Sequence, residues 1–134
     1  MLRPRIIPCL LIQNGGLVKT VQFGDPKYVG DPLNTVRIFN EKKVDELMVV
    51  DIDASRLGIA INETLIAHLA AECRMPLCYG GGVKSVKQLE RLISLGVEKV
   101  ALSSAAVNDP EIVSCGGLSI PNSQNSFVTL NYLE

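Results

Sequence analysis

The chain has 134 residues, of which 47% are hydrophobic and 20% charged, and its formal net charge is -1. This length allows at most one domain, and so high a hydrophobic content argues against disorder, because burying that much apolar side chain offsets the entropy lost on folding. The near-neutral charge excludes an extended basic surface for nucleic acid or anionic membranes, and no apolar run approaches the ~20 residues that span a bilayer.

The N-terminus passes directly into a strand-like pattern, without the apolar block of a secretory signal, so we expect a cytoplasmic protein. The four cysteines form no C-x-x-C pair and are expected to be inert thiols; they are Cys9, Cys73, Cys78 and Cys115. The single histidine, His68, lies in a helical pattern with no second ligand type nearby. We therefore expect neither a bound metal nor a cofactor.

Strand-like and helix-like patterns alternate along the chain. Strands are expected where apolar runs are near-continuous, as in parallel sheets, or follow a turn signal: residues 6–12, 17–23, 47–52, 75–79 and 100–103. Helices are expected where a capping residue precedes apolar residues at helical spacing: from Asp31-Pro32, over 62–74, from Ser85 to Gly96, and from Asn108 onward. Residues 24–31, rich in Gly, Asp and Pro, predict a loop.

Strands that alternate with helices predict an α/β fold of right-handed βαβ units on a parallel sheet. A TIM (β/α)₈ barrel needs ~250 residues and eight strands, so we predict a parallel (β/α)4 half of such a barrel, truncated, over residues 1–113. Its fourth helix is expected to be incomplete, because glycine and proline interrupt it within about one turn. Residues 114–134 are predicted to be a divergent, poorly determined tail in which only 127–130 are strand-like.

Three consecutive glycines, Gly80, Gly81 and Gly82, follow a short buried strand and precede a helix-like pattern. Backbone N–H groups at such a turn suit a phosphate, because they and the positive end of the helix dipole converge on the anion. Ser103 and Ser104 stand at the equivalent point one unit later. Two such turns suggest a phosphorylated small molecule as the ligand, although close packing between strand and helix also selects glycine.

Residues 1–113 closely resemble the N-terminal half of the cyclase (synthase) subunit of imidazole glycerol phosphate synthase. The resemblance is carried by residues 5–10, Asn14-Gly15, Val18-Lys19, 30–32, 45–47, 51–55, the triple glycine and 104–107. That family is a (β/α)₈ barrel that receives ammonia from a glutaminase partner. It uses the ammonia to cleave and cyclise a bisphosphorylated ribulosyl intermediate of histidine biosynthesis, so the resemblance implies a lyase of amino-acid biosynthesis.

One residue departs from the family pattern. In the family the first strand ends with a catalytic aspartate in a Cys-Leu-Asp pattern, whereas here Cys9-Leu10 is followed by Leu11, and leucine can neither take nor give a proton. The resemblance implies that Lys19, on the loop after the first strand, and Asp51, near the mouth, remain as catalytic candidates. A solvated surface lysine is the alternative for Lys19. Asp53 and Ser55 are expected to cap the loop.

Leu11, together with residues 16–20 and 77–80, resembles a divergent branch of the family associated with sugar amidation in O-antigen biosynthesis. That branch pairs with a glutaminase-like subunit and a sugar amidotransferase, and we favour it over the histidine enzyme. Arg5, Glu46 and Lys99 each precede a predicted strand, and in the family charges at these positions form the gate by which ammonia enters the barrel. The alternative is that they cap strand ends and keep that face soluble.

Three hypotheses therefore stand beside one another. The chain is an ammonia-dependent cyclase or lyase, a non-catalytic partner that channels ammonia to an amidotransferase, or a truncated and inactive product. Leu11 favours the second over the first. Half a barrel exposes strand edges and an apolar interior, so we also expect the chain to associate with a copy of itself. No nucleic acid or membrane partner is expected.

Overall fold

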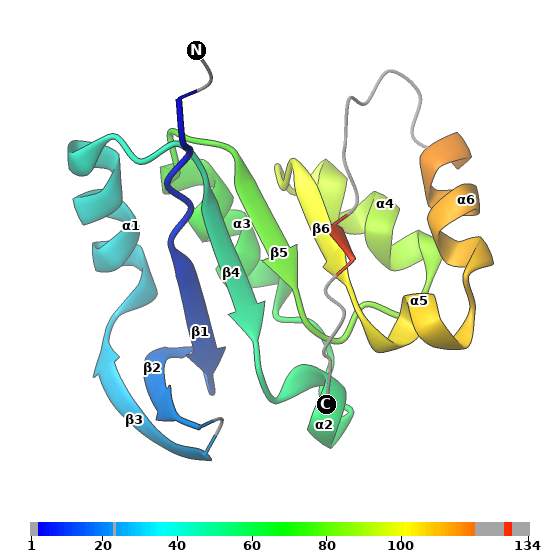
Figure 1. Cartoon of the computed structure of the whole chain (residues 1–134), viewed down its shortest axis with the longest axis horizontal. Helices are drawn as coiled ribbons and strands as arrows, with labels where there is room; N and C mark the ends of the chain where they lie inside the picture. Colours follow the sequence, from blue (N-terminus) through cyan, green and yellow to red (C-terminus); the bar gives the residue numbers. More distant parts are fainter. Residues whose placement is uncertain (1–2, 23, 120–127, 130–134) are drawn as a thin grey trace.

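The computed structural model of this chain describes residues 3–22, 24–119 and 128–129. Its strands form one sheet in the order β3-β2-β1-β4-β5-β6-β7 (Figure 1). The strands are β1 (Cys9–Gln13), β2 (Gly16–Val21), β3 (Gly24–Gly30), β4 (Leu47–Asp51), β5 (Leu77–Gly80), β6 (Lys99–Leu102) and β7 (Val128–Thr129). The helices are α1 (Pro32–Lys42), α2 (Ala54–Leu57), α3 (Glu63–Glu72), α4 (Val86–Ser94), α5 (Ser104–Asn108) and α6 (Glu111–Ser119).

The sheet is mostly parallel and does not close on itself. Strands β1, β4, β5, β6 and β7 pair in parallel, and β2 and β3 extend the sheet as an antiparallel hairpin beside β1. The predicted α/β class is confirmed, and the open parallel sheet fits part of a TIM barrel. The division into four βα units and the boundary at residue 113 stay predictions, because α2, α5 and β7 add elements to that plan.

Three of the predicted helix starts are confirmed by their capping geometry. The side chains of Asp31, Asn62 and Ser85 accept hydrogen bonds from the third backbone N–H that follows, at 3.1, 3.1 and 3.3 Å. Each such bond satisfies one of the amide groups that the first turn of a helix leaves without a partner. Short polar side chains therefore set where α1, α3 and α4 begin.

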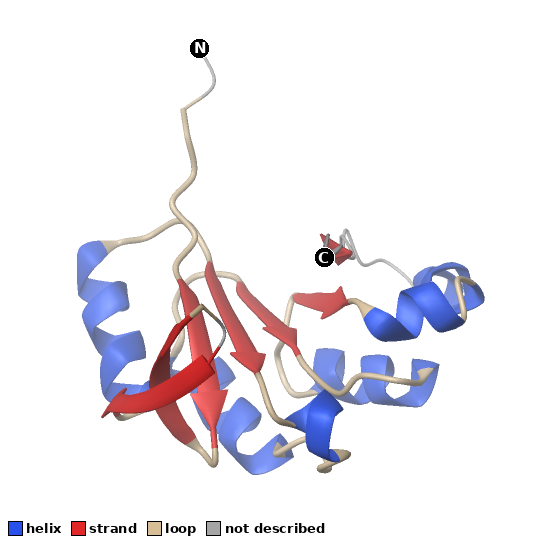
Figure 2. Ribbon diagram, turned by 60° about the horizontal axis from the view of Figure 1, so that its bottom comes forward, coloured by secondary structure: helices blue, strands red, loops and turns tan. Residues whose placement is uncertain are grey.

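The hydrophobic core lies between one face of the sheet and the helices that cover it (Figure 2). Alternate residues of the parallel strands point into it, namely Leu10, Ile12, Leu47, Val49, Leu77, Tyr79, Val100 and Leu102. They meet Val36 of α1, Ile66 and Leu69 of α3, Leu89 and Leu92 of α4, and Ile112 of α6. This burial is the main stabilising contribution to the fold, at about 25 cal/mol for each Å² of apolar surface removed from water.

The other face of the sheet carries two rows of side chains set by the strand register. Cys9, Met48, Cys78 and Lys99 form one row, and Leu11, Val50, Gly80 and Ala101 form the next. In a closed barrel such rows become the layers that fill the interior. Here this face, which we call the open face, curves away from the helices (Figure 2).

Three sequence predictions were wrong. Residues 24–31 are not a loop, because Gly24–Gly30 form β3, whose Tyr28 ring packs on Gly16 of β2; an edge strand tolerates the proline and aspartate that suggested a loop. The first strand begins at Cys9 rather than at Ile6. The helix near residue 110 does not stop within one turn but continues to Ser119, through two glycines.

The predicted tail lies mostly outside the described residues, at 120–127 and 130–134. Within it, the strand-like pattern at 127–130 is confirmed at Val128–Thr129, which pair in parallel with β6. Short helices α2 and α5 follow β4 and β6 and were not predicted. Among the described helices, none combines the length and apolar character that crossing a bilayer requires.

Candidate functional site

The N-terminal edge of the sheet brings three predicted charges into direct contact. Glu46, just before β4, is buried to 4% exposure. The Lys99 ammonium donates to both of its carboxylate oxygens, Oε1 and Oε2, at 2.9 Å each. The Arg5 guanidinium also donates to Oε1. The structure therefore assembles Arg5, Glu46 and Lys99 into one cluster, which we call the Glu46 cluster.

The geometry of the Glu46 cluster follows from strand alternation. Glu46 lies two residues before Met48, and Lys99 pairs with Cys78 in the same row, so the cluster borders the open face of the sheet. Lys99 is 23% exposed and Arg5 60% exposed, so the carboxylate is covered while its partners reach solvent. A buried carboxylate needs such partners, because desolvation of an unpaired charge costs several kcal/mol.

A second carboxylate, that of Asp45, holds the segment before β1 in place beside this cluster. Asp45 Oδ2 accepts a hydrogen bond from the Ile6 amide at 2.7 Å, and its other oxygen lies 3.7 Å from Arg3. The amides of Asp45 and Glu46 in turn donate to the Ile6 carbonyl. Backbone bonding at Ile6 explains why the extended segment before β1 stays in place without strand pairing there.

At the opposite, C-terminal edge, the glycine turn packs tightly against the loop that follows β4. Gly81 has a φ of +116°, and a Cβ on it would lie 2.5 Å from the Asp51 carbonyl oxygen. Gly82 has a φ of +71°, and a Cβ there would lie 2.9 Å from the Ala54 Cβ. Both positions therefore require glycine for backbone reasons, so the glycines alone are no proof of a phosphate site.

The two predicted phosphate turns do lie side by side. Strands β5 and β6 are parallel neighbours, and Gly80 pairs with Ala101. Gly82 and Ser103 each stand two residues beyond that pair, at the same edge of the sheet. Ser103 opens α5 without a side-chain capping bond, and Ser104 is exposed. The glycine turn and the serines therefore follow neighbouring strand ends at one edge of the sheet, and their role in binding phosphate stays a prediction.

Asp51, a predicted catalytic residue, is engaged in holding the loop after β4. Its Oδ1 accepts hydrogen bonds from the amides of Asp53 at 3.0 Å and Ala54 at 3.1 Å. Next to it, the Tyr79 hydroxyl donates to the Gly81 carbonyl at 3.0 Å. Burial, with the nearby charge of Asp51, raises the pKa of Tyr79 well above its ordinary value. This edge therefore holds the neutral phenol of Tyr79 and the side chain of Asp51, one oxygen of which accepts backbone hydrogen bonds.

Asp53 corrects a prediction. Its side chain makes no capping bond, although the residue occupies the N-cap position of α2. Instead Asp53, at 5% exposure, accepts from Gln13 Nε2 at 2.8 Å and from Arg56 Nη2 at 3.0 Å. Neither Gln13 nor Arg56 is predicted from the sequence, where the charge three residues after Asp53 is the one signal that points to Arg56.

Lys19 and Leu11 lie away from the glycine turn, along β1 and the hairpin beside it. Lys19 is exposed on β2, where it pairs in register with Lys27 of β3. Leu11 is half-buried on the open face, opposite Val18. Both line a shallow groove with Thr20 and Val29. Among the described residues no hydrogen bond or ion pair joins Lys19 to Asp51, and their catalytic roles stay predictions.

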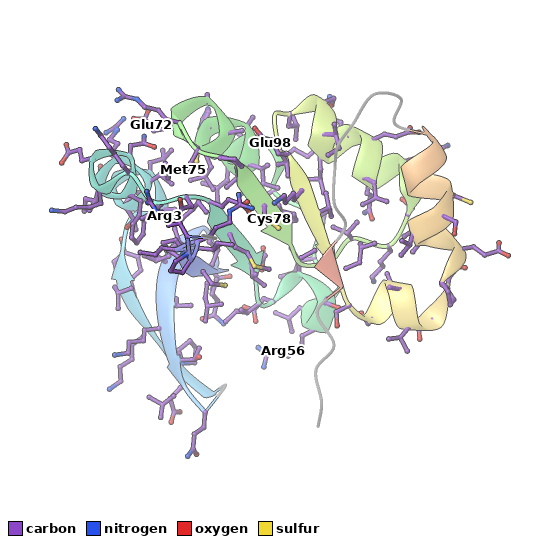
Figure 3. The ribbon with its side chains drawn as sticks, turned by 45° about the horizontal axis from the view of Figure 1, so that its top comes forward. Arg3, Arg56, Glu72, Met75, Cys78 and Glu98 are labelled. Atoms are coloured by element: carbon purple, nitrogen blue, oxygen red, sulfur yellow. The ribbon has the colours of Figure 1, made fainter. Side chains whose placement is uncertain are left out.

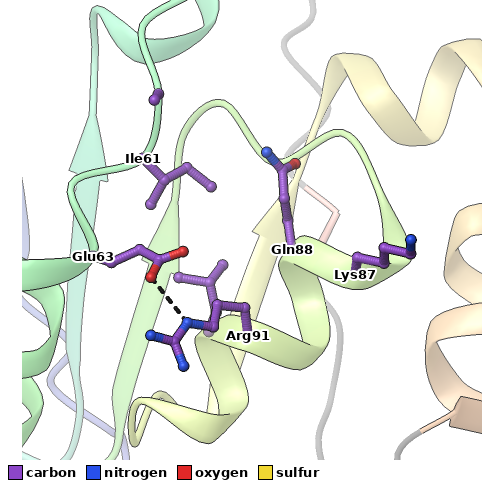
Figure 4. A pocket seen from close by; sticks show the side chains of 7 residues that line it. Ile61, Glu63, Lys87, Gln88 and Arg91 are labelled. Atoms are coloured by element: carbon purple, nitrogen blue, oxygen red, sulfur yellow. Dashed lines mark hydrogen bonds and ion pairs between the residues drawn. The ribbon is translucent and has the colours of Figure 1, made fainter.

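Other polar features lie outside these two edges. On the helix-covered side, Arg91 of α4 donates to Glu63 of α3 at 2.9 Å in a shallow groove beside Lys87 (Figure 4). Within the described part of the chain, no group of three or more His, Cys, Asp or Glu side chains could hold a metal ion. Cys78, labelled in Figure 3, lies in the row of the open face that also contains Met48 and Lys99. Burial raises the pKa of its thiol to about 11.

Comparisons with known proteins show the family to which the chain belongs. A family described as "Histidine biosynthesis protein" matches residues 5–129. A "Putative imidazole glycerol phosphate synthase subunit HisF" of Leptospira borgpetersenii is 62% identical over 114 residues, which cover 85% of this chain and 45% of that protein.

Two further relatives carry similar names. The "Putative imidazole glycerol phosphate synthase subunit hisF3" of Vibrio vulnificus is 61% identical, over 85% of this chain and 44% of its own length. The "Putative imidazole glycerol phosphate synthase subunit hisF2" of Pseudomonas aeruginosa is 58% identical, over 84% of this chain and 45% of its own length. The chain thus spans less than half the length of the curated relatives that it matches.

Proposed function

This chain belongs to the histidine biosynthesis protein family, and we propose that it forms one side of a cyclase-subunit barrel that binds a phosphorylated substrate and receives ammonia. The observation that carries the proposal is the placement of Gly82 and Ser103 at equivalent ends of neighbouring parallel strands. In α/β proteins, ligands bind beyond the carboxyl ends of the strands. Serine hydroxyls and backbone N–H groups at such an edge suit phosphate oxygens.

The Glu46 cluster supports the ammonia-receiving part of the proposal. Its two cations share one buried carboxylate at the strand edge opposite the phosphate turns. Ammonia released by a glutaminase docked on that edge would have to pass this cluster to reach the open face. Arg5 and Lys99 would act as a gate, because moving either side chain exposes the carboxylate and opens the edge.

Leu11 supports a second candidate function. With leucine on β1 in place of an acid, the open face lacks a carboxylate on that strand. The chain would then serve as a non-catalytic partner that channels ammonia. This agrees with membership of the branch that acts in sugar amidation for O-antigen, together with a glutaminase-type subunit and a sugar amidotransferase. Relatives with 58–62% identity carry numbered or putative names, which fits a branch beside the histidine enzyme.

The phosphate part is tested by thermal unfolding of the full chain with ribose 5-phosphate and, for comparison, ribose. A ligand that binds only the folded state raises the melting temperature, and the rise grows with the logarithm of the ligand concentration above its Kd. Ribose 5-phosphate should therefore stabilise the chain and ribose should not. Ser103→Asp, which places a negative charge at the turn, should abolish the shift. Ser114→Asp, on the exposed part of α6, is the matched control and should preserve it. Equal behaviour of the two variants would refute the phosphate site.

The ammonia part is tested with a glutaminase-type subunit from the same cells. The wild-type chain should bind it and stimulate glutamine hydrolysis. Lys99→Ala should keep the binding but change the stimulation, because it removes one side of the gate. Restoration of ammonia-dependent cyclisation by Leu11→Asp would favour the enzyme over the channelling partner. A chain that neither binds nor stimulates any such subunit would refute this part of the proposal.

We also propose that the open face is covered by a second copy when the chain is alone. Its rows bring the half-buried Leu11, Met48 and Val50 together on a sheet that Figure 2 shows to be curved. Contiguous apolar side chains that reach the surface favour association. Sedimentation of the purified chain should give a dimer, and Met48→Asp should shift it toward the monomer. A wild-type chain that sediments as a monomer at high concentration would contradict this.

A further inference from the structure

Three side chains at the C-terminal edge of the sheet form a network that the proposed function does not use. Asp53 lies between the end of β1 and the single turn of α2. Its Oδ2 accepts from Gln13 Nε2 at 2.8 Å, and its Oδ1 accepts from Arg56 Nη2 at 3.0 Å. Both carboxylate oxygens are thus engaged, and the network joins the end of β1 to the loop after β4, 40 residues further along the sequence.

The network is not required to cap α2. Asp51 already accepts from the amides of Asp53 and Ala54, which are the first donors of that turn. The Asp53 side chain is therefore free to bind Arg56. Because another residue holds the turn, helix capping does not explain why an aspartate is buried at this position.

Nor does ion-pair stability explain the network. The Arg56 side chain is 70% exposed, and exposed pairs at this spacing contribute only about 0.5 kcal/mol. Burying a carboxylate carries a desolvation cost, so the pair adds little to the stability of the fold. What Asp53 does achieve is to fix the direction of a long, otherwise mobile guanidinium.

Arg56 stands at the same edge as the predicted phosphate turns. It lies two residues after Ala54, whose Cβ is 2.9 Å from the position that a Cβ on Gly82 would occupy. Within the described residues, Arg56 uses one guanidinium nitrogen in a side-chain hydrogen bond. An arginine has five N–H donors in a planar fork that matches an oxyanion. Arg56 also offsets the negative charge of Asp51 and Asp53, which would otherwise repel an anion.

We propose that Arg56 binds an oxyanion of the substrate at this edge and that Asp53 is the positioning residue that aims it. The inference rests on the proposed function, because it assigns a side chain to the phosphate that the glycine and serine turns are proposed to bind. Gln13 completes the arrangement by holding the second oxygen of Asp53 from β1. The edge then offers a fixed cation in addition to backbone and hydroxyl groups.

The test is a titration of the full-length chain with inorganic phosphate at constant ionic strength, followed by the amide NMR signals of Gly81 and Gly82. Arg56→Gln should weaken phosphate binding roughly tenfold, the loss of one charge-assisted hydrogen bond, and Arg56→Lys should recover part of it. Arg37→Gln is the matched control, because Arg37 is also an exposed arginine, paired with Glu72 on the helix-covered side. It should leave the affinity unchanged.

Asp53→Asn separates positioning from a merely structural role. If Asp53 aims Arg56, the amide releases the guanidinium and phosphate binding weakens roughly threefold. If Asp53 only supports the loop, removing its negative charge tightens phosphate binding, and that result would overturn the inference. Unchanged binding by Arg56→Gln, a substitution at an exposed side chain, would overturn it as well. A wild-type chain that binds no phosphate would overturn both this inference and the proposed phosphate site.

Discussion

The two edges of the parallel sheet are built by different physical means. At the N-terminal edge, Glu46 is buried and held by two cations from distant parts of the sequence. At the C-terminal edge, Gly81 and Gly82 press against the loop after β4, and polar side chains bind mainly backbone or one another. One edge is closed by charge pairing and the other is shaped by close backbone contact.

The two edges therefore differ in how far their side chains and backbone can move. Ion pairs can open and close without disturbing the strands, because Arg5 is exposed and its guanidinium can move into solvent. A backbone turn in contact with Asp51 has no such freedom, so it offers a fixed shape to a ligand. We therefore propose gating for the N-terminal edge and ligand binding for the C-terminal edge.

The largest expected effect is on the glycine turn. Gly81→Ala should destabilise the chain by about 3 kcal/mol, because the new Cβ meets the Asp51 carbonyl and the backbone has a positive φ. Gly58→Ala is the matched control: its φ is +64° and nothing lies within 4 Å of the new Cβ, so it should cost only about 1 kcal/mol. Urea unfolding measures both, and equal losses would mean that the turn is not closely packed.

The Glu46 cluster should show the next largest effect. Glu46→Ala leaves the half-buried Lys99 without its partner and should cost about 2 kcal/mol. Glu72→Ala, which removes the exposed partner of Arg37, should cost at most about 0.5 kcal/mol. Denaturant unfolding at low and high salt distinguishes the two positions. A Glu46 variant as stable as the Glu72 variant would show that the cluster is held no more tightly than a surface pair.

The smallest effect concerns pH. Because burial raises the pKa of Tyr79 in the folded chain, the folded state keeps this proton where the unfolded chain loses it, near pH 10. The contribution of Tyr79 to the free energy of unfolding is complete below pH 10 and is lost as the pH rises above that value. Tyr79→Phe should therefore flatten the fall in stability above pH 10, while it costs about 1 kcal/mol at neutral pH through the lost bond to Gly81.

Cys78 also contributes to the fall in stability at high pH, because burial raises the pKa of its thiol to about 11. The informative quantity is the difference between wild type and Tyr79→Phe, measured by urea unfolding from pH 8 to pH 11. Parallel curves for the two proteins would contradict a buried, protonated phenol at this edge.

The sequence predicted the strands and the N-terminal cluster better than the loops. Glu46 directly precedes β4 and Lys99 opens β6, and the parallel sheet brings the starts of these strands to one edge. That Arg5, Glu46 and Lys99 belong together came from the family resemblance, and their role as a gate stays a prediction. The capping residues Asp31, Asn62 and Ser85 likewise fixed three helix starts. Edge strand β3 was missed, because its pairing with β2 depends on register and on the packing of Tyr28 over Gly16, which propensity does not report.

The roles of loop residues could not be derived from spacing. Asp51 and Asp53 are two residues apart with the same side chain, yet one binds backbone amides and the other binds Gln13 and Arg56. That division depends on how the turn of α2 meets the end of β1, which only the three-dimensional structure supplies. The roles of Lys19, Asp51 and the Glu46 cluster in a reaction stay predictions.

The most direct measurement asks at which edge of the sheet a phosphate ester binds. Ribose 5-phosphate is titrated into the full chain, and the amide NMR shifts of both edges are followed together. Our account predicts saturable shifts at Gly81, Gly82 and Ser103, with Glu46 and Lys99 unmoved. Shifts confined to the N-terminal edge, or none at any concentration that leaves the chain folded, would contradict the assignment of ligand binding to the C-terminal edge.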